Sequence, residues 1–197
     1  MSNRARTIFR CLAVHLAGLL LLAEGASAVF VQLPNPVPLQ EASMDLLRNS
    51  SAEDADQWKL VMFGFSHCSD ICPTSLANMG WLVGVAAKEG ISLDGVFVSI
   101  DPDRDTDSVL GKFTSPFGKG TSYLRLEDEA LESFKDQFAV EAVFYTKNRG
   151  NDFHYQVDHS STAFLIDADG RIRVAFDALE DVKAAAAMLR EKREFFQ

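Results

Sequence analysis

The sequence lacks several features that would define its class at once. Its 197 residues include only three cysteines, no extended run of lysine or arginine, no internal repeat and no low-complexity tract. A chain near 200 residues can bury roughly 70% of its extended surface, so one domain needs no disulfide framework to be stable. Acidic residues outnumber basic ones by 28 to 19, for a net charge of −9, which argues against binding through phosphate neutralisation. We therefore expect no nucleic-acid partner.

The apolar stretch nearest the N-terminus is too short for a comfortable transmembrane span. It covers residues 11–23, follows three arginines and precedes the small residues Ala26-Ser27-Ala28. A basic start, a short apolar stretch and an A-x-A site are the three parts of a secretory signal peptide. We expect residues 1–28 to be that signal and the mature protein to be periplasmic. An uncleaved anchor, with the domain facing the periplasm, is the alternative.

Removal of this segment changes both the charge and the cysteine count. Three arginines and one glutamate leave with it, so 16 basic and 27 acidic residues remain, for a net charge of −11. Cys11 leaves as well. The mature domain then has a single pair of cysteines, Cys68 and Cys72.

The remaining pattern predicts an α/β fold. Residues 29–57 contain three alternating prolines, so we expect a loop-like, poorly defined N-terminal segment there. From residue 58 to residue 197, short apolar runs alternate with helical segments. Strands are expected at 60–65, 95–100, 123–126, 142–146, 153–157, 163–166 and 172–176, and helices at 73–89, 106–113, 128–138 and 179–194. Such an order indicates a mixed central sheet flanked by helices.

Cys68 and Cys72 are expected where the first core strand gives way to a helix. Residues four apart on a helical turn lie about 5–6 Å apart at Cβ, so the pair can form a disulfide or hold one metal ion. The partial positive charge of a helix N-terminus favours a thiolate, so we expect Cys72 to be more acidic than a free thiol. In an exported protein, two cysteines most often form a stabilising disulfide. A bridge that closes so short a loop stabilises little, which favours redox or metal chemistry.

Two thiolates restrict the choice of metal. An iron–sulfur cluster normally needs four cysteines, and structural zinc would need both cysteines and two of the three remaining histidines. Copper, with two thiolates and one imidazole, is the simpler fit. The candidate histidines are His67, His154 and His159. His67 adjoins Cys68 and should diverge from it, and His154 lies at an expected hairpin tip, whereas His159 precedes a core strand that would pack against the cysteine turn.

Three segments in this order resemble the Sco/SenC family of exported copper-binding proteins. They are GFSHCSDICPT at 64–74, VSIDPDRDT at 98–106 and VDHSS at 157–161, within a resemblance that covers residues 58–195. The resemblance implies a thioredoxin-like fold and copper, as Cu(I) and also as Cu(II).

The same resemblance implies a site and a task. Cys68, Cys72 and His159 match the family's copper ligands. The implied function is delivery of copper to the binuclear copper site of cytochrome c oxidase, or reduction of the cysteines there. The partner would be a cytochrome c oxidase subunit or another copper-site protein, and we expect a monomer.

Two enzymatic functions remain as alternatives. A thiol–disulfide oxidoreductase acting on exported proteins would use one cysteine to attack a disulfide and the other to resolve the intermediate. The chain has C-x3-C in place of the thioredoxin C-x-x-C, and it has no proline just before Ala163. A peroxidase would need an activating group beside its thiol, for which Arg104 is the candidate. The structural interpretation of residues 101–106 is an Asp-Pro turn, a helix cap and an arginine held by carboxylates.

Overall fold

The computed structural model describes residues 30–50, 57–68, 71–145 and 155–196. The expected signal peptide and His154 lie outside the described residues, as does the expected hairpin tip at 147–152. Within the described ranges, no helix has both the length and the apolar character needed to cross a bilayer.

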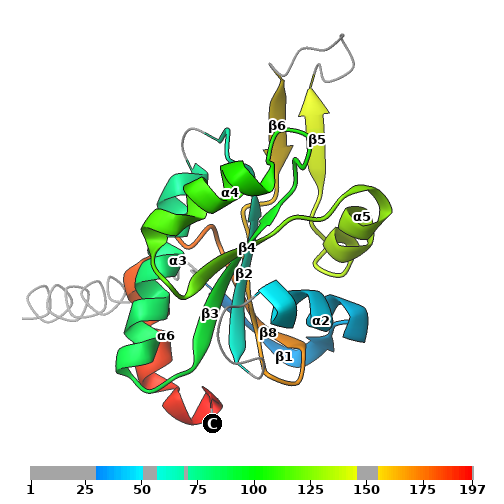
Figure 1. Ribbon diagram of the computed structural model, residues 1–197. Coiled ribbons are helices and arrows are strands. Elements are labelled where there is room, and N and C mark those ends of the chain that lie inside the picture. Colours follow the sequence, from blue (N-terminus) through cyan, green and yellow to red (C-terminus); the bar gives the residue numbers. More distant parts are fainter. Residues whose placement is uncertain (1–29, 51–56, 69–70, 146–154, 197) are drawn as a thin grey trace, which may run out of the picture.

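A six-stranded mixed sheet in the order β1-β8-β7-β2-β3-β4 forms the centre of the molecule (Figure 1). Its strands are Phe30–Pro38 (β1), Trp58–Gly64 (β2), Leu93–Ser99 (β3), Thr121–Leu124 (β4), Ala163–Ile166 (β7) and Arg171–Phe176 (β8). β2, β3 and β4 run parallel, whereas β7 is antiparallel to β2 and to β8. The mixed central sheet predicted from the alternation of apolar runs is confirmed.

Helices cover both faces of this sheet. α3 (Ile71–Lys88), α4 (Asp107–Thr114) and α6 (Val182–Glu191) lie on one face, and α2 (Glu41–Ser50) and α5 (Asp128–Asp136) lie on the other (Figure 1). β2 is buried along its whole length because it serves both cores. Leu60 and Met62 pack toward α3 and α6, while Val61 and Phe63 pack toward α2 and α5, as the two-residue period of a strand requires.

The N-terminal segment is not the loop that its prolines predicted. β1 pairs antiparallel with β8 at the edge of the sheet, and its register shifts between Gln32 and Val37. Proline has no N–H to donate, so within sheets it is tolerated on edge strands and at such irregularities. α2 follows and buries Met44 and Leu47 against the sheet. The loop expectation was wrong because an edge strand accepts the residues that usually mark a loop.

A separate two-stranded ribbon projects from one end of the central sheet (Figure 1). It consists of β5 (Ala142–Tyr145) and β6 (Gln156–His159), paired antiparallel with Ala142 opposite His159. The strand expected at 153–157 is displaced to 156–159. His159 is therefore the last residue of a strand, four residues before β7 begins.

Candidate metal centre

The two cysteines lie where β2 passes into α3. Beyond Gly64 the chain turns, and the Cys68 N–H donates to the Phe65 carbonyl at 3.2 Å. Cys72, the second residue of α3, is 1% exposed, whereas Cys68 is half-buried. The Cys72 N–H donates to the Cys68 sulfur at 3.4 Å, so one of the backbone N–H groups at the start of α3 finds its acceptor in the other cysteine. The two cysteines are not joined by a disulfide in this structure.

Gly64 leaves the space that the Cys72 sulfur occupies. A Cβ at this position would lie 3.0 Å from the Cys72 Sγ and 2.8 Å from the ring of Phe97. The contact with Phe97 is too close for a Cβ, and the contact with the sulfur is tight enough to require a small shift. The end of β2 therefore needs glycine so that the thiol can pack directly against the strand.

His159 brings its imidazole to the same thiol from a distant part of the chain. Its Nε2 lies 3.8 Å from the Cys72 Sγ, across 87 residues of sequence. Its Nδ1 lies 2.8 Å from the Ser160 carbonyl, which can only accept, so Nδ1 carries the proton and the Nε2 lone pair faces the sulfur. The ring of Phe65 packs edge-on against the imidazole, with centroids 5.8 Å apart.

Both groups are neutral in the metal-free protein. Burial raises the pKa of the Cys72 thiol to about 12, and a hydrogen bond with Cys68 adds to the rise. The expectation of an acidic Cys72 was wrong, because a sulfur sunk between β2 and α3 loses more hydration than the helix N-terminus returns. Burial also lowers the pKa of His159. A metal held here would meet a neutral imidazole and would displace the thiol proton.

His67, which the structure also describes, does not join this pair. The His67 side chain is 53% exposed, and its Nδ1 contacts the Ser66 hydroxyl at 3.0 Å and lies 4.0 Å from an Asp105 carboxylate oxygen. Among the residues that the structure describes, no three Cys, His, Asp or Glu side chains converge closely enough to form a closed metal site. The structure thus places Cys72 beside His159 and links Cys68 to the Cys72 backbone.

Asp105 is the site residue whose position the sequence did not indicate. Its carboxylate is fully buried and accepts from the Ser66 backbone N–H at 3.1 Å, from the Ser66 hydroxyl at 2.5 Å and from the Ser99 hydroxyl at 2.7 Å. It therefore fastens the turn before Cys68 to the end of β3. The available signal was its place after β3, since parallel strands β2 and β3 end at the same edge of the sheet.

The helix cap and the carboxylate-held arginine predicted within residues 101–106 are confirmed. Thr106 caps α4 by accepting from the Val109 N–H at 3.4 Å, and the Arg104 guanidinium forms a buried ion pair with Asp101. Asp101 also accepts from the Tyr155 hydroxyl at 2.5 Å. Arg104 is engaged by these groups, so the arrangement does not support the peroxidase alternative.

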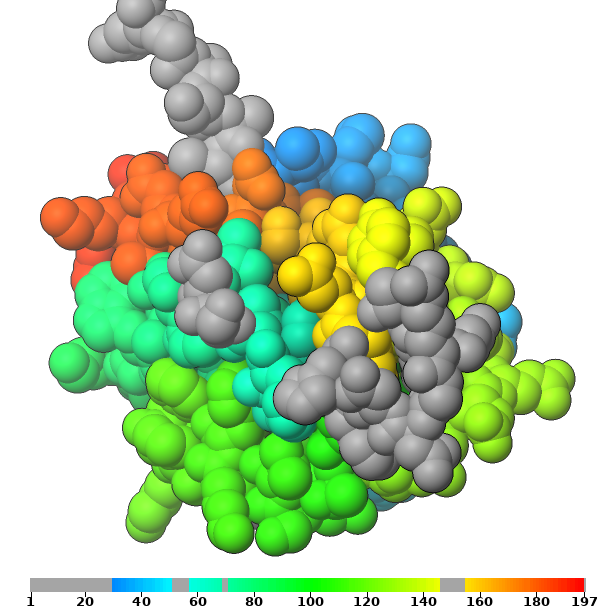
Figure 2. All heavy atoms as spheres, turned by 90° about the horizontal axis from the view of Figure 1, so that it is seen from above, coloured from blue at the N-terminus to red at the C-terminus, as the bar shows by residue number. Residues whose placement is uncertain are grey.

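Figure 2 looks down on this end of the sheet, where the cyan atoms around the cysteine turn border the yellow atoms of β6. A cavity of about 280 Å³ lies at the base of the two-stranded ribbon. It is lined by Ala139, Glu141, Val143, Asp158, His159 and Ser160.

Comparison with known proteins decides the family. The SCO1/SenC family model matches residues 48–194, which include both cysteines, residues 101–106 and His159. The chain belongs to the SCO1/SenC family. The resemblance drawn from three short motifs is thereby confirmed, and the SCO1/SenC match begins within α2, after β1.

Curated SCO1/SenC relatives are similar over part of their length. The chain is 37% identical over 130 residues to a SCO2-like protein of Rickettsia felis, covering 63% of this chain and 62% of that protein. It is 35% identical over 119 residues to the mitochondrial protein SCO1 of Saccharomyces cerevisiae, covering 58% and 39%. The chain thus spans less than two thirds of the length of these relatives.

Solved SCO1/SenC structures share the fold. Bradyrhizobium japonicum ScoI with copper bound superposes with a TM-score of 0.60 at 26% identity, covering 73% of this chain and 87% of that one. Yeast Sco1 with copper bound gives a TM-score of 0.62 at 25% identity, covering 85% and 91%. The expected thioredoxin-like fold agrees with these neighbours.

Proposed function

We propose that this protein binds copper through Cys68, Cys72 and His159 and carries it as cargo to the copper site of cytochrome c oxidase. The observation that carries the proposal is the 3.8 Å approach of the His159 Nε2 to the Cys72 Sγ, with the imidazole lone pair directed at the sulfur. The two copper-bound relatives named above support the choice of metal.

The donor set suits copper chemically. Soft thiolates favour Cu(I), and two thiolates with one imidazole also accept Cu(II). The hydrogen bond from Nδ1 to the Ser160 carbonyl fixes the tautomer that offers Nε2 to a metal, as backbone carbonyls commonly do for metal-binding histidines. Cys68, half-buried and bonded to the Cys72 backbone, needs only a local adjustment to add a third donor.

We further propose that the protein works as a monomer outside the cytoplasm, in the periplasm or anchored facing it, on the basis of the signal-like segment at 1–28. Its partner would be a cytochrome c oxidase subunit or another copper-site protein. Copper passes between ligand sets only when they are in contact, because metal–ligand bonds span only about 2.0–2.3 Å.

Copper titration of the reduced protein tests the ligand set. In a Cys11→Ser background, which leaves only the site thiols, we expect one tightly bound Cu(I) by competition with a chromophoric chelator. Cys68→Ser with His159→Ala should abolish tight binding. His67→Ala is the matched control and should bind copper normally, since the His67 ring faces Ser66 and Asp105. One tight Cu(I) retained by the double variant would refute the assignment.

Thiol reduction is the second candidate, favoured by the unequal exposure of the two cysteines. Cys68 is accessible and would attack a partner's disulfide as a thiolate, releasing one partner thiol and forming a mixed disulfide. The buried Cys72 would then lose its proton and attack the Cys68 sulfur. The partner leaves with both cysteines reduced, and a Cys68–Cys72 disulfide remains.

The two candidate functions differ in whether the protein transfers copper or reduces disulfides. A copper carrier should transfer Cu(I) stoichiometrically and reduce a generic disulfide no faster than a small dithiol does. A dedicated reductase should reduce an oxidised peptide from a binuclear copper site much faster than a generic disulfide. The reduction potential of the Cys68–Cys72 pair, measured against glutathione, decides whether that reaction runs forward.

A further inference from the structure

Arg104 lies between two aromatic rings at the edge of the candidate copper site. The centre of its guanidinium is 3.8 Å from the ring centroid of Tyr155 and 5.4 Å from that of Phe65. The residue is only 9% exposed, so these contacts are shielded from water, where cation–π attraction is stronger than at exposed sites. Arg104 thus contacts one residue from each side of the site.

Phe65 connects the guanidinium to the cysteine turn. Its carbonyl accepts from the Cys68 N–H at 3.2 Å, and its ring packs edge-on against the imidazole of His159. If the Phe65 ring were displaced, the imidazole would lose the ring that it packs against, and the turn that carries Cys68 would be disturbed.

Tyr155 connects the guanidinium to the strand of the histidine. It directly precedes β6, and its carbonyl accepts from Arg104 Nη1 at 3.0 Å. Its hydroxyl donates to Asp101, which also pairs with Arg104. Ring, carbonyl and hydroxyl of one residue are thus all held by Asp101 and Arg104.

The ribbon needs such an attachment. β5 and β6 form a sheet of their own, outside the six-stranded sheet, and an isolated pair of strands is at best marginally stable. The position of His159 relative to Cys72 consequently depends on contacts at the base of the ribbon. The contacts of Arg104 with Tyr155 and Phe65 lie at this base and reach both sides of the site.

We propose that Arg104 is a positioning residue for the copper site: by holding Phe65 and Tyr155 together, it sets the imidazole of His159 over the Cys72 thiol. The expected effect on copper affinity rests on the copper function proposed above. The placement of the imidazole can be measured without copper. Lysine cannot replace arginine in this role, because an ammonium has no plane to lie against two rings.

The test is Arg104→Lys, which keeps a positive charge for Asp101. Substitutions in the residues that orient a metal-binding histidine typically lower metal affinity about 10- to 100-fold, and we expect a Cu(I) affinity lower by that factor. Arg173→Lys is the matched control. Arg173 also lies over a ring, 4.5 Å from the centroid of Phe195, and pairs with Asp167 at 3.0 Å, but at the opposite end of the sheet. It should leave copper affinity unchanged.

A double-variant cycle separates positioning from general stability. If Arg104 acts through the histidine, Arg104→Lys should lower affinity little further in a His159→Ala background. An equal loss in both backgrounds would overturn the proposal, as would an unchanged affinity in the single variant.

A second readout uses the metal-free protein. The ring protons of His159 feel the ring current of Phe65, so Arg104→Lys should shift their NMR signals while Arg173→Lys leaves them in place. Unchanged signals would refute the positioning role even if the copper proposal holds, and absence of copper binding in the unsubstituted protein would refute the copper proposal alone. Should Arg104→Lys not fold, Tyr155→Leu removes one ring and leaves the Asp101–Arg104 pair, with the same shift expected.

Discussion

Cys72 and His159 meet as two neutral groups, and copper binding has to change one of them. The thiol must lose its proton to become a ligand, because the thiolate and not the thiol binds the metal. The imidazole is already in its binding form, because its pKa is lowered by burial. Protons and copper therefore compete mainly at the sulfur.

Copper uptake should release a proton from Cys72 throughout the neutral range. Since the pKa of this thiol is raised to about 12, it is fully protonated near pH 7, and its share of the Cu(I) affinity should fall about tenfold for each unit that the pH decreases. A weakly buffered titration with a pH indicator should show about one more proton released per Cu(I) by the unsubstituted protein than by Cys72→Ser. Equal release by both proteins would contradict the assignment of a protonated Cys72.

Acid should destabilise the metal-free protein through His159. The folded-state pKa of this residue is lowered, so the unfolded chain binds the proton more readily once the pH falls below about 6.5. The free energy of unfolding should therefore decrease from pH 7 toward pH 5, and less steeply in His159→Gln. Denaturant titrations at several pH values measure this, with His67→Gln as the exposed control. Parallel pH profiles for the unsubstituted protein and His159→Gln would exclude His159 as the cause.

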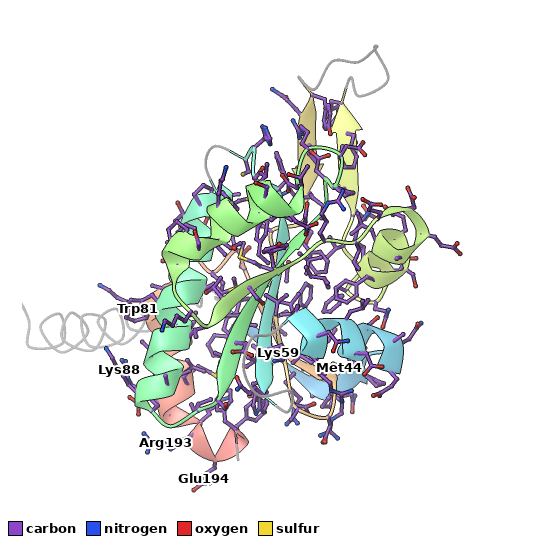
Figure 3. All side chains as sticks on the ribbon, in the orientation of Figure 1. Met44, Lys59, Trp81, Lys88, Arg193 and Glu194 are labelled. Carbon is purple, nitrogen blue, oxygen red and sulfur yellow. The ribbon has the colours of Figure 1, made fainter. Side chains whose placement is uncertain are left out.

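A buried ion pair also lies at the other end of the sheet. Lys59 of β2 is fully buried, and its Nζ lies 2.8 Å from the Asp94 carboxylate of β3; the labelled lysine sits in the middle of the side chains in Figure 3. The two residues are opposite each other in the parallel register. Each keeps the other from being an uncompensated charge in an apolar environment.

Asp94→Asn should cost about 3–5 kcal/mol of unfolding free energy, because it leaves a buried ammonium without its carboxylate. The matched control is the surface pair of Arg190 and Glu89, whose atoms lie 3.3 Å apart and are partly exposed. Arg190→Gln should change the unfolding free energy by less than about 1 kcal/mol. Chemical denaturation measures both changes in unfolding free energy. Equal changes would show that the buried pair contributes no more to stability than the exposed pair.

At the scale of the element, the turn between β7 and β8 depends on its glycine. Gly170 has a φ of +80°, and a Cβ there would lie 2.6 Å from the Met44 side chain of α2, which is labelled in Figure 3. The Asp-Gly turn signal in the sequence is confirmed by this conformation. Its packing against α2 was not foreseeable, because α2 itself was not expected.

Gly170→Ala should lower stability by more than about 1 kcal/mol, since alanine is strained at this φ and would collide with Met44. Gly84→Ala is the opposite case. Gly84 lies within α3, with open space around its Cα, so alanine should raise stability by up to about 1 kcal/mol. Thermal unfolding should move the two midpoints in opposite directions, and a shift of the same sign would contradict the argument.

Elements differed in how well the sequence predicted them. Buried strands β2 and β3 were predicted within two residues because an apolar run between polar segments has few alternatives. β1 was missed because an edge strand needs neither a continuous apolar run nor a full set of N–H donors. The acidity of Cys72 was misjudged for a related reason, since the sequence indicates a helix N-terminus but not the depth at which it is buried.

At the scale of the whole molecule, the candidate copper ligands and an aromatic cluster lie at different ends of the sheet. The candidate ligands gather where β2 ends and the ribbon begins, whereas Trp58 at the start of β2 packs against Phe195 and Phe196 near the C-terminus. The sequence indicated the candidate ligands because their residue types are distinctive. It could not predict Arg104 between Phe65 and Tyr155, because each is an ordinary residue and only the folded chain brings them together.

Removal of the first 38 residues should show whether β1 contributes to stability, to copper binding or to both. Loss of β1 exposes the edge of β8, and an exposed edge strand promotes association. We expect a lower thermal midpoint and concentration-dependent self-association by light scattering, with one Cu(I) per chain retained. Loss of copper binding by a folded truncated protein would show that β1 supports the site directly.

Cys72 and His159 are 87 positions apart in the sequence, yet their side chains are neighbours in the fold. Such a contact requires the closure of a long loop, which costs chain entropy that a local contact does not cost. An unfolded chain holds its two cysteines four residues apart with no imidazole beside them. If copper binds as proposed, its three ligands therefore come together only in a folded molecule.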